Sequence, residues 1–205
     1  MRKKIRFFPQ HSGETCGSSC CLMLLDYYQR NLKWPTVKME WKLYRKYQVA
    51  GFKGMTGAAV ANCLSWPRNN LDVHLVQSFQ DQMENWDPVF SEEDMEKTIR
   101  SYRKHLEECR DRIRLSAGTP FDCVFLRQQL DEGKKIVLQC FVPETEDGPP
   151  SMLHWVILER YENGRFRVRD PIPKGKLWHY SPEELEELMD TPIGKICIVV
   201  GEPND

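Results

Sequence analysis

The sequence predicts an α+β fold in which helices come first and an antiparallel sheet follows. Apolar residues recur at helical spacing through residues 16–64, whereas short runs rich in β-branched residues, separated by turn residues, follow residue 133. A charge-rich helical stretch lies between these two regions. Because 205 residues are enough for one substantial core and no internal repeat is visible, we expect a single domain over residues 1–205 with a helical insertion at about residues 81–117.

Three helices are expected in the first third of the chain. The first begins at Cys16 after a polar segment and runs to about residue 30, and its apolar composition places it in the core. The second covers residues 36–49, and the third covers residues 58–64 with Thr56 as its N-cap. The N-terminal part is therefore expected to be a helical layer, with Cys16 where its first helix begins.

The middle of the chain is expected to hold one strand and two helices. Residues 72–79 alternate apolar with polar side chains, as a half-buried strand does. Residues 91–115 have the spacing of a solvated amphipathic helix, with Ser91 as its N-cap and acidic residues in its first turn. Thr119, followed by a proline, is expected to begin the next helix, which ends at Gly133.

The expected sheet is built from four apolar runs in the last third of the chain. These runs are residues 134–142, 151–161, 165–170 and 195–200. Asn163-Gly164, between the second and third runs, accepts the positive φ angles of a two-residue hairpin turn. Ser181, followed by a proline, opens a last helix before the final strand. We therefore expect an N-terminal helical part packed on a C-terminal antiparallel sheet.

The charge balance and the hydropathy pattern narrow the class of partner. The chain has 29 Lys and Arg residues against 30 Asp and Glu residues, so nothing favours nucleic acid or an acidic membrane as a partner. No apolar run approaches the roughly 18 residues that a membrane span needs. The basic start MRKKIRFFPQ is followed by polar residues rather than by the apolar region of a signal peptide. We therefore expect a soluble, cytoplasmic protein without a signal peptide that acts on a small molecule, a peptide or a protein.

The eight cysteines are expected to be free thiols in a reducing compartment. A chain of this size does not need a disulfide framework, and several of the cysteines lie in apolar runs, as Cys140 and Cys197 do. Structural zinc is disfavoured, because the close cysteines that begin at Cys16 lack the second CxxC or HxxxH pair of such sites. We therefore expect no metal and no cofactor.

The segment PQHSGETCG contains the strongest candidate for chemistry. A thiol attacks as a thiolate, and the positive end of a helix favours that form, so Cys16 is the candidate nucleophile. Gly17 would let a substrate backbone approach, whereas Cys20 and Cys21 are expected to pack inside the helix. Acyl transfer through a thiol also needs a donor to the oxyanion, which the Gln10 amide could supply beside the backbone N–H of Cys16.

His154 is the candidate base, because it begins a strand whose hairpin partner ends at Asp170. In a two-residue hairpin centred on Asn163-Gly164, facing residues have numbers that sum to 327, whereas 154 and 170 sum to 324. A ladder with an even sum is needed to put both side chains on one face. We therefore expect either an odd number of loop residues or a β-bulge. With either, Asp170 can orient the His154 imidazole, as the third member of a catalytic triad does.

His11, next to Gln10, is the alternative base. It belongs to the same segment as the candidate nucleophile and does not easily approach from across a cleft, so His154 is preferred. The other histidines are expected on the surface or in strands: His74, His105 and His179. Trp155 is expected to point to the opposite face from His154, into the core.

Four positions together resemble the papain-like cysteine peptidases that process bacteriocin leader peptides after a double glycine: Gln10, Cys16-Gly17, His154 and Asp170-Pro171. The resemblance implies that Gln10 lines the oxyanion hole and that Cys16 attacks the substrate carbonyl. It further implies that His154 acts as general base and acid and that Asp170 orients the imidazole. The order of the four positions along this chain is that of the family.

The resemblance covers about residues 5–80 and 118–200 and implies a papain-like fold. It implies an endopeptidase that cuts a peptide or protein after small residues such as Gly-Gly. Most members are domains of a membrane exporter, but no membrane span or nucleotide-binding motif is visible in this sequence. The chain is more similar to free-standing relatives, which include toxins and effectors that cut proteins in a target cell. Such a role implies an immunity protein or another partner protein.

The residues leave other functions open. An acyltransferase, a deamidase or an amidase would use the same Cys-His-Asp site with a different acceptor or leaving group. A non-catalytic peptide-binding domain would keep the fold without turnover. The charged insertion is explained by a solvated helix, and contact with a protein partner is the alternative explanation.

Overall fold

The computed structural model describes residues 4–29, 35–49, 54–80, 91–143, 150–173 and 177–202. Within these ranges the α-helices are α1 (Cys16–Tyr28), α2 (Val37–Tyr47), α3 (Gly57–Leu64), α4 (Glu92–Cys109), α5 (Cys123–Asp131) and α6 (Pro182–Met189). The strands are β1 (Asp72–Gln77), β2 (Arg114–Ser116), β3 (Lys135–Pro143), β4 (Pro150–Glu162), β5 (Arg165–Arg169), β6 (Leu177–Tyr180) and β7 (Ile196–Gly201). The predicted α+β fold class is confirmed.

The strands form one sheet in the order β2-β1-β7-β3-β4-β5-β6. Neighbouring strands are antiparallel except β1 and β2, which run parallel. The prediction of an antiparallel sheet is confirmed for β3, β4, β5 and β7. It is wrong in confining the sheet to the C-terminal part, because β1 from the middle of the chain pairs with β7. The short strands β2 and β6 were not predicted.

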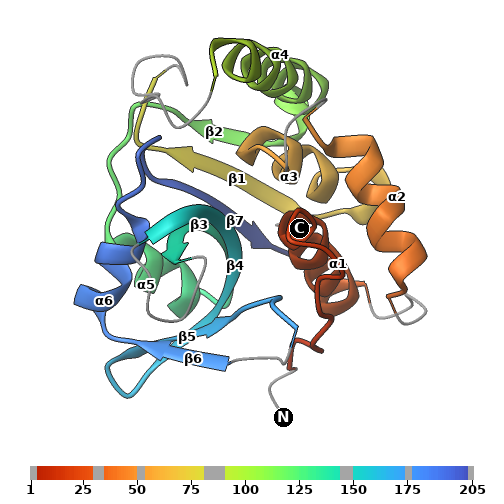
Figure 1. Ribbon diagram of the computed structural model, residues 1–205. Coiled ribbons are helices and arrows are strands. Elements are labelled where there is room, and N and C mark those ends of the chain that lie inside the picture. The colour runs from red at the N-terminus through yellow and green to blue at the C-terminus, as the bar shows by residue number, and fades with distance from the viewer. Residues whose placement is uncertain are drawn as a thin grey trace.

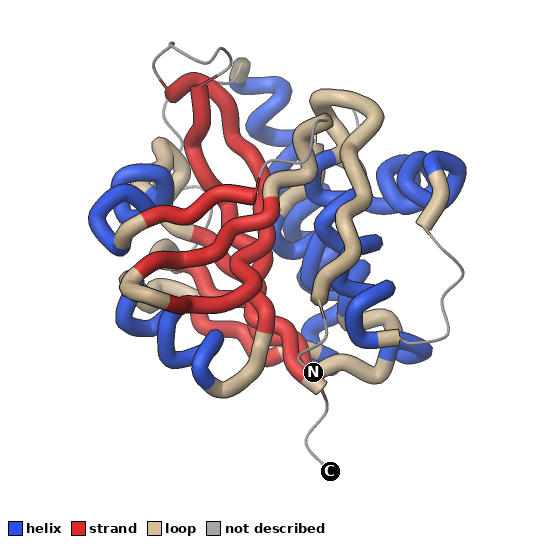
Figure 2. Tube along the Cα trace, turned by 90° about the horizontal axis from the view of Figure 1, so that it is seen from below, coloured by secondary structure: helices blue, strands red, loops and turns tan. Residues whose placement is uncertain are grey.

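Helices cover both faces of the sheet, as Figure 1 shows from one side and Figure 2 from below. Trp155 and Ile157 of β4 lie in a buried cluster with residues of α1 and α3. Val156 and Leu158 of the same strand lie in a second buried cluster with residues of α5 and α6. Because successive side chains of a strand point to opposite faces, each face of β4 needs an apolar cover. The two helical layers supply that cover.

Most helix starts are those expected from the sequence. The N-cap residues of α2, α3, α4 and α6 are Thr36, Thr56, Ser91 and Ser181. Each hydroxyl accepts a hydrogen bond from the backbone N–H three residues further on. Such a bond satisfies one of the unpaired N–H groups at the start of a helix. The helix starts that the sequence predicted from these residues are therefore confirmed.

The predicted start of α5 is wrong. Asp122, not Thr119, is the N-cap, and its side chain accepts a hydrogen bond from the Phe125 N–H at 3.0 Å. The Thr119 N–H instead donates to the Gln77 carbonyl at 3.1 Å, beside the end of β1. Thr119 is therefore still hydrogen-bonded to the end of β1, and α5 begins only after Asp122.

α4 is shorter and less solvated than predicted. It ends at Cys109 rather than near residue 115, and Ile113 lies beyond it, just before β2. Tyr102 is buried, and its hydroxyl donates to the side-chain oxygen of Gln77 at 2.7 Å. The described part of the predicted insertion is thus joined to the sheet, through this hydrogen bond and through the pairing of β2 with β1.

The tight turn between β4 and β5 is the one predicted. Asn163 and Gly164 have φ angles of 52° and 76°. Both lie in the left-handed region that asparagine and glycine tolerate best, and two such residues match the twist of a hairpin. Glu162 and Arg165 pair on either side of the turn.

A β-bulge interrupts the same hairpin, and it is one of the two alternatives that the residue numbers predicted. Arg160 pairs with Arg167, a sum of 327, but the next pair is Leu158 with Val168, a sum of 326. Glu159 therefore has no place in the ladder, and the register changes from an odd to an even sum at this residue. The change puts residues 154 and 170 on one face of the hairpin.

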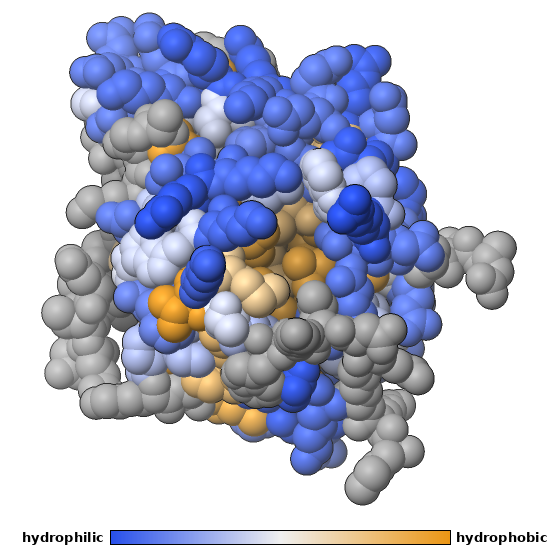
Figure 3. All heavy atoms as spheres, turned by 90° about the vertical axis from the view of Figure 1, so that its right-hand side faces the viewer, coloured by the Kyte–Doolittle hydropathy of each residue, from blue (hydrophilic) through white to orange (hydrophobic). Residues whose placement is uncertain are grey.

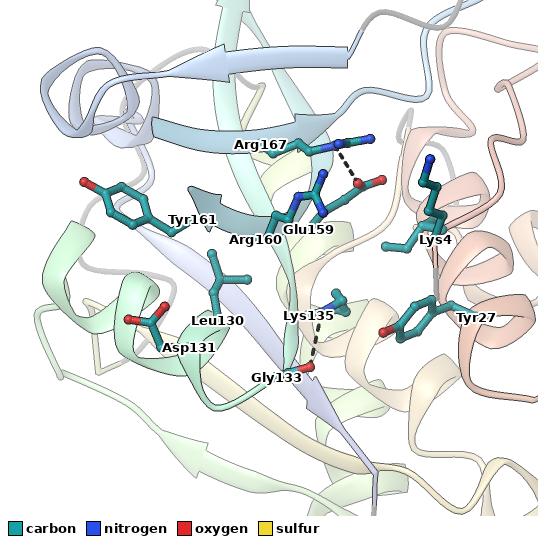
Figure 4. Close-up of a pocket in the computed structure, with 11 residues that line it drawn as sticks. Lys4, Tyr27, Leu130, Asp131, Gly133, Lys135, Glu159, Arg160, Tyr161 and Arg167 are labelled. Atoms are coloured by element: carbon teal, nitrogen blue, oxygen red, sulfur yellow. Dashed lines mark hydrogen bonds and ion pairs between the residues drawn. The ribbon is translucent and has the colours of Figure 1, made fainter. Parts of the chain in front are cut away.

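The bulged residue is held by two arginines of β5. The Glu159 carboxylate is 3.0 Å from the Nε atom of Arg167, and it forms a second ion pair with Arg169. Figure 4 shows Arg167 and Glu159 pointing toward one another. The Glu159 side chain is 8% exposed. Ion pairs buried to this extent are screened far less by water than pairs on the surface.

Substituting Glu159 with alanine is expected to lower the free energy of unfolding by about 3 kcal/mol, because it leaves two cations of low exposure without their shared carboxylate. Urea unfolding followed by circular dichroism measures this change. Glu162→Ala is the matched control. It removes the neighbouring carboxylate, whose side chain is 37% exposed, and we expect a loss of less than about 1 kcal/mol. Equal losses would show that Glu159 does not stabilise the hairpin through its buried pairs.

The surface of the molecule is largely hydrophilic on the face that Figure 1 has at its right. Figure 3 shows polar side chains around a hollow with apolar side chains near its centre. The large apolar side chains that are exposed come from different elements and loops: Val37, Trp66, Leu115, Val124 and Ile172. Within the described ranges, no helix is long and apolar enough to cross a membrane.

Candidate active site

Cys16 is the first residue of α1. At this position the backbone N–H groups of the first turn have no partner within the helix, so they form the positive end of the helix dipole. The first turn contains no acidic side chain, and Thr15 makes no side-chain capping bond. The positive end of α1 therefore acts on the Cys16 thiol without a neutralising carboxylate in that turn.

The structure brings His154 of β4 into contact with Asp170, which directly follows β5. His154 Nε2 is 2.8 Å from Asp170 Oδ1, and both residues are buried. Asp170 Oδ1 also accepts a hydrogen bond from the Ile172 N–H at 2.9 Å, which orients the carboxylate. The other ring nitrogen, His154 Nδ1, is buried and makes no hydrogen bond with the described residues. The imidazole therefore has one nitrogen engaged with Asp170 and one nitrogen left for proton exchange.

Cys16 and His154 shift each other's pKa. Burial opposes ionisation of Cys16, but the nearby His154 imidazole and the backbone of Trp155 and Gly17 lower the pKa of the thiol below its ordinary value of 9.0. Burial also opposes protonation of His154, but Asp170 and Cys16 raise the pKa of the imidazole to about 10. The two shifts have opposite directions, and together they favour a thiolate beside an imidazolium.

Gln10 lies against the segment that carries Asp170. Its backbone N–H donates to the Pro171 carbonyl at 2.7 Å, a contact that the sequence did not predict. The Gln10 side chain is buried, and the described residues offer its Oε1 atom no hydrogen-bond partner. Buried polar groups in proteins nearly always have a partner, so this unpaired acceptor oxygen sets Gln10 apart from an ordinary core residue.

The structure gives Gly17 a different role from the predicted one. A Cβ atom at residue 17 would come within 3.2 Å of Trp155 Cδ1 and 3.3 Å of Met55 Cβ. Gly17 therefore allows α1 to pack closely against these two side chains, and the sequence prediction that it admits a substrate backbone is not needed to explain it. Trp155 itself is core, as predicted, and its indole N–H donates to the Met55 carbonyl at 2.9 Å.

Six other cysteines differ from Cys16 in the direction of their pKa shifts. Cys20 is fully buried and its thiol donates to the Trp155 carbonyl at 3.3 Å, and burial raises its pKa. For Cys21, a hydrogen bond with Cys63, followed by burial, raises the pKa. Burial also raises the pKa of Cys109, Cys123, Cys140 and Cys197. The predicted packing roles of Cys20 and Cys21 are consistent with this burial.

His11, the alternative base, is engaged by a residue that the sequence reasoning missed. Its Nδ1 atom is 2.6 Å from Glu40 Oε2, and Glu40 of α2 is 0% exposed. A lone glutamate in a helix gives no signal of such burial. The sequence pattern that could have indicated burial of Glu40 is its helical spacing from Tyr44 and Tyr47. These three residues lie on one face of α2, and all three are buried.

The remaining histidines do not approach the His154–Asp170 pair. The prediction that His105 lies on the surface or in a strand is wrong, because it is buried on α4 with its Nδ1 atom 3.2 Å from the Asn62 amide nitrogen. His74 lies on β1, with Nε2 2.9 Å from the Ser116 hydroxyl, and His179 lies on β6. Both strand positions agree with the sequence prediction.

The cavity drawn in Figure 4 is separate from these residues. It has a volume of about 260 Å³ and lies among the N-terminal segment, α1, the end of α5, β3 and the β4–β5 hairpin. Its lining includes none of the four predicted site residues: Gln10, Cys16, His154 and Asp170. Within the described ranges, no group of three or more His, Cys, Asp or Glu side chains is placed to hold a metal ion.

No family model matches this sequence, and no curated protein matches it. Solved structures do match. One is a crystal structure described as a C39-like peptidase from Bacillus anthracis, with a TM-score of 0.56 and 13% identity over 99% of this chain and 97% of that chain. Another is a double glycine motif protease from an AMS/PCAT transporter in complex with the leader peptide, with a TM-score of 0.51 and 13% identity over 98% of this chain and 94% of that chain.

These likenesses extend over almost the whole chain at low identity, so they bear on the fold. The arrangement of helices on a mixed sheet is that of the papain-like C39 peptidases. The predicted papain-like fold is therefore confirmed.

Proposed function

We propose that this protein is a papain-like cysteine endopeptidase with Cys16 as its nucleophile, His154 as its general acid and base, and Asp170 as the residue that orients the imidazole. One observation carries the proposal. A thiol of lowered pKa at a helix N-terminus lies beside an imidazole whose far nitrogen is 2.8 Å from a buried carboxylate. A core cysteine or a core histidine needs no such arrangement.

The first half-reaction forms an acyl-enzyme. The Cys16 thiolate attacks the carbonyl carbon of the scissile peptide bond, and the oxygen becomes an oxyanion that the Gln10 amide and the Cys16 backbone N–H stabilise. The C–N bond then breaks while the His154 imidazolium donates its proton to the leaving amine. The products are a thioester on Cys16 and a free amino terminus.

The second half-reaction releases the acyl group. His154, now neutral, accepts a proton from a water molecule as the water oxygen attacks the thioester carbonyl. The C–S bond breaks, the acyl group leaves as a carboxylic acid, and the thiolate and the imidazolium are restored. Asp170 keeps the ring nitrogen that it contacts in place throughout both half-reactions.

The proposed substrate is a peptide or protein cut after small residues such as Gly-Gly. The support is indirect: one structural neighbour is a double glycine motif protease bound to a leader peptide, which is a property of that protein. A toxin or effector role with an immunity partner stays a prediction from the sequence, because no described residue bears on it.

Mass spectrometry of peptides incubated with the full chain tests the proposal. A peptide with a Gly-Gly pair is expected to give two fragments whose masses sum to the substrate plus one water, and a matched peptide with bulky residues at the two positions is expected to stay intact. One uncut product of slightly changed mass would indicate deamidation, and a product joined to an added amine would indicate acyl transfer. Either result would replace the endopeptidase reading.

Asp170→Asn is expected to change the pH profile of cleavage. Asp170 helps to raise the pKa of His154 from its ordinary value of 6.5 to about 10. In the wild type the imidazole therefore stays protonated up to about pH 10. Removing the charge lowers that pKa, so we expect the alkaline limb of kcat/KM to move to lower pH, with a loss of about 100-fold at the plateau. The acid limb, set by Cys16, lies below pH 9.0 in the wild type.

Steady-state rates from pH 5 to 10.5 measure both effects. Asp190→Asn is the matched control, because Asp190 is an exposed aspartate at the end of α6, and it is expected to leave the profile unchanged. An alkaline limb that stays in place in Asp170→Asn would contradict the assigned role of Asp170.

A further inference from the structure

The segment between Gln10 and Cys16 is held from outside the proposed site by a carboxylate of α2. Glu40 Oε1 accepts a hydrogen bond from the His11 backbone N–H at 2.9 Å and another from the Ser19 hydroxyl at 3.2 Å. Glu40 Oε2 is 2.6 Å from His11 Nδ1. One fully buried carboxylate therefore contacts the residue after Gln10 and a residue in the first turn of α1 after Cys16.

Burial of a carboxylate is unfavourable unless hydrogen bonds compensate for the lost water. Glu40 obtains three such contacts, all from the two sides of the Gln10–Cys16 segment. Hydrogen bonds to an ionised acceptor are shorter and stronger than neutral ones, so the contacts restrict the positions of His11 and Ser19. Replacing Glu40 by a neutral side chain would weaken these restraints without changing the shape of the core.

The same segment is held at other points. The Gln10 N–H donates to the Pro171 carbonyl at 2.7 Å, beside the Asp170 carboxylate. Tyr44, one turn after Glu40 on α2, donates its hydroxyl proton to Glu14 at 2.7 Å. The Gln10 backbone thus lies between a contact to Pro171 and the contacts of Glu40 to the next residue. Backbone position decides where the buried Gln10 amide points.

We propose that Glu40 is a positioning residue, which holds the Gln10 side chain and the Cys16 backbone N–H in the relative placement that an oxyanion needs. His11 takes part as the link between Glu40 and Gln10, with its Nδ1 atom committed to that contact. This inference rests on the proposed peptidase function. It gives α2, which carries no residue of the proposed triad, a part in the reaction.

Glu40→Gln separates oxyanion placement from thiolate formation. We expect kcat for peptide cleavage to fall about tenfold with KM within twofold, because a charge-assisted contact is lost while the shape is kept. A peptide aldehyde, whose adduct with Cys16 places an oxygen in the oxyanion hole, is expected to bind about tenfold more weakly. Alkylation of Cys16 by iodoacetamide builds no such oxygen, so its rate and its pH dependence are expected to stay unchanged.

A double-mutant cycle with Gln10→Ala tests the path of the effect. If Glu40 acts through Gln10, Glu40→Gln lowers kcat by less than about threefold in the Gln10→Ala background, whereas independent roles give the full tenfold loss in both backgrounds. Glu187→Gln, at an exposed position of α6, is the control for loss of one carboxylate and is expected to leave kcat unchanged.

The possible results distinguish failure of the positioning role from failure of the proposed function. Equal slowing of alkylation and cleavage in Glu40→Gln, or a full effect without Gln10, overturns the positioning role. Absence of both cleavage and selective Cys16 alkylation in the wild type overturns the proposed function instead. If thermal unfolding shows that Glu40→Gln is not folded, Ser19→Ala removes one of the three contacts and is expected to lower kcat about threefold with alkylation unchanged. An unchanged kcat in folded Ser19→Ala then overturns the inference.

Discussion

Cys16→Ala is expected to abolish peptide cleavage, with kcat/KM lowered by at least about 10⁴-fold. The reason is that the proposed reaction passes through a thioester on this sulfur, and no other thiol is placed to take over. Cys20, one turn further along α1, has a raised pKa and donates its proton to the Trp155 carbonyl. Initial rates on the cleaved peptide, at enzyme concentrations confirmed by absorbance, measure the loss.

Cys20→Ala is the matched control for removing a thiol from α1. Its activity is expected to stay within about threefold of the wild type, since the substitution removes a buried thiol and its hydrogen bond to the Trp155 carbonyl but no group that the proposed reaction uses. Peptide mapping after brief treatment with iodoacetamide at pH 7 adds a second test. Cys16 is expected to be labelled first, because its pKa alone is lowered among the thiols with a clear shift. Cleavage by Cys16→Ala, or uniform labelling, would contradict the assignment.

His154→Ala is expected to lower kcat/KM by about 10³-fold, because it removes both the acid that protonates the leaving amine and the base that activates water. The substitution also removes the group that lowers the pKa of Cys16. Burial raises the pKa of the thiol, and in this variant only the backbone contacts of Trp155 and Gly17 oppose that effect. The pH at which Cys16 alkylation reaches half its maximal rate is therefore expected to rise.

His179→Gln is the matched control for this substitution. His179 is an exposed histidine on β6, and neither cleavage nor alkylation is expected to change when it is replaced. If His154→Ala lost cleavage but kept the wild-type pH dependence of alkylation, the imidazole would not be the group that favours the thiolate, and the ion-pair account would fail.

The residues of the candidate site could be selected from the sequence because each carries a local signal. Cys16 stands where polar residues give way to an apolar helix, and His154 and Asp170 stand near the two open ends of a hairpin with an unmistakable turn. The sum of the two residue numbers predicted either an odd number of loop residues or a β-bulge, and the structure has the bulge. Its place at Glu159 could not be predicted, because it depends on two arginines of β5 that are close only after the strands have paired.

The errors in the predicted fold also arise from contacts between residues that are distant in the sequence. Thr119 has the chemistry of an N-cap, but its N–H is already bonded to Gln77 at the end of β1, and Asp122 takes the capping role. Strands β2 and β6 are too short to show a pattern, and they exist because neighbouring strands offer them partners. Glu40 is polar and helical, so only its spacing from Tyr44 and Tyr47 indicates burial. In each case a distant contact outweighs the local preference.

The bulge at Glu159 also decides how relatives of this chain can be recognised from their sequences. The separation of 16 between His154 and Asp170 counts one residue that has no partner in the ladder. Deleting that residue would leave Leu158 opposite Val168 and would keep histidine and aspartate on one face. Deleting a paired residue nearer the turn, with the bulge retained, would put them on opposite faces. A motif with a fixed spacing would therefore miss relatives whose hairpin is shorter by the bulged residue.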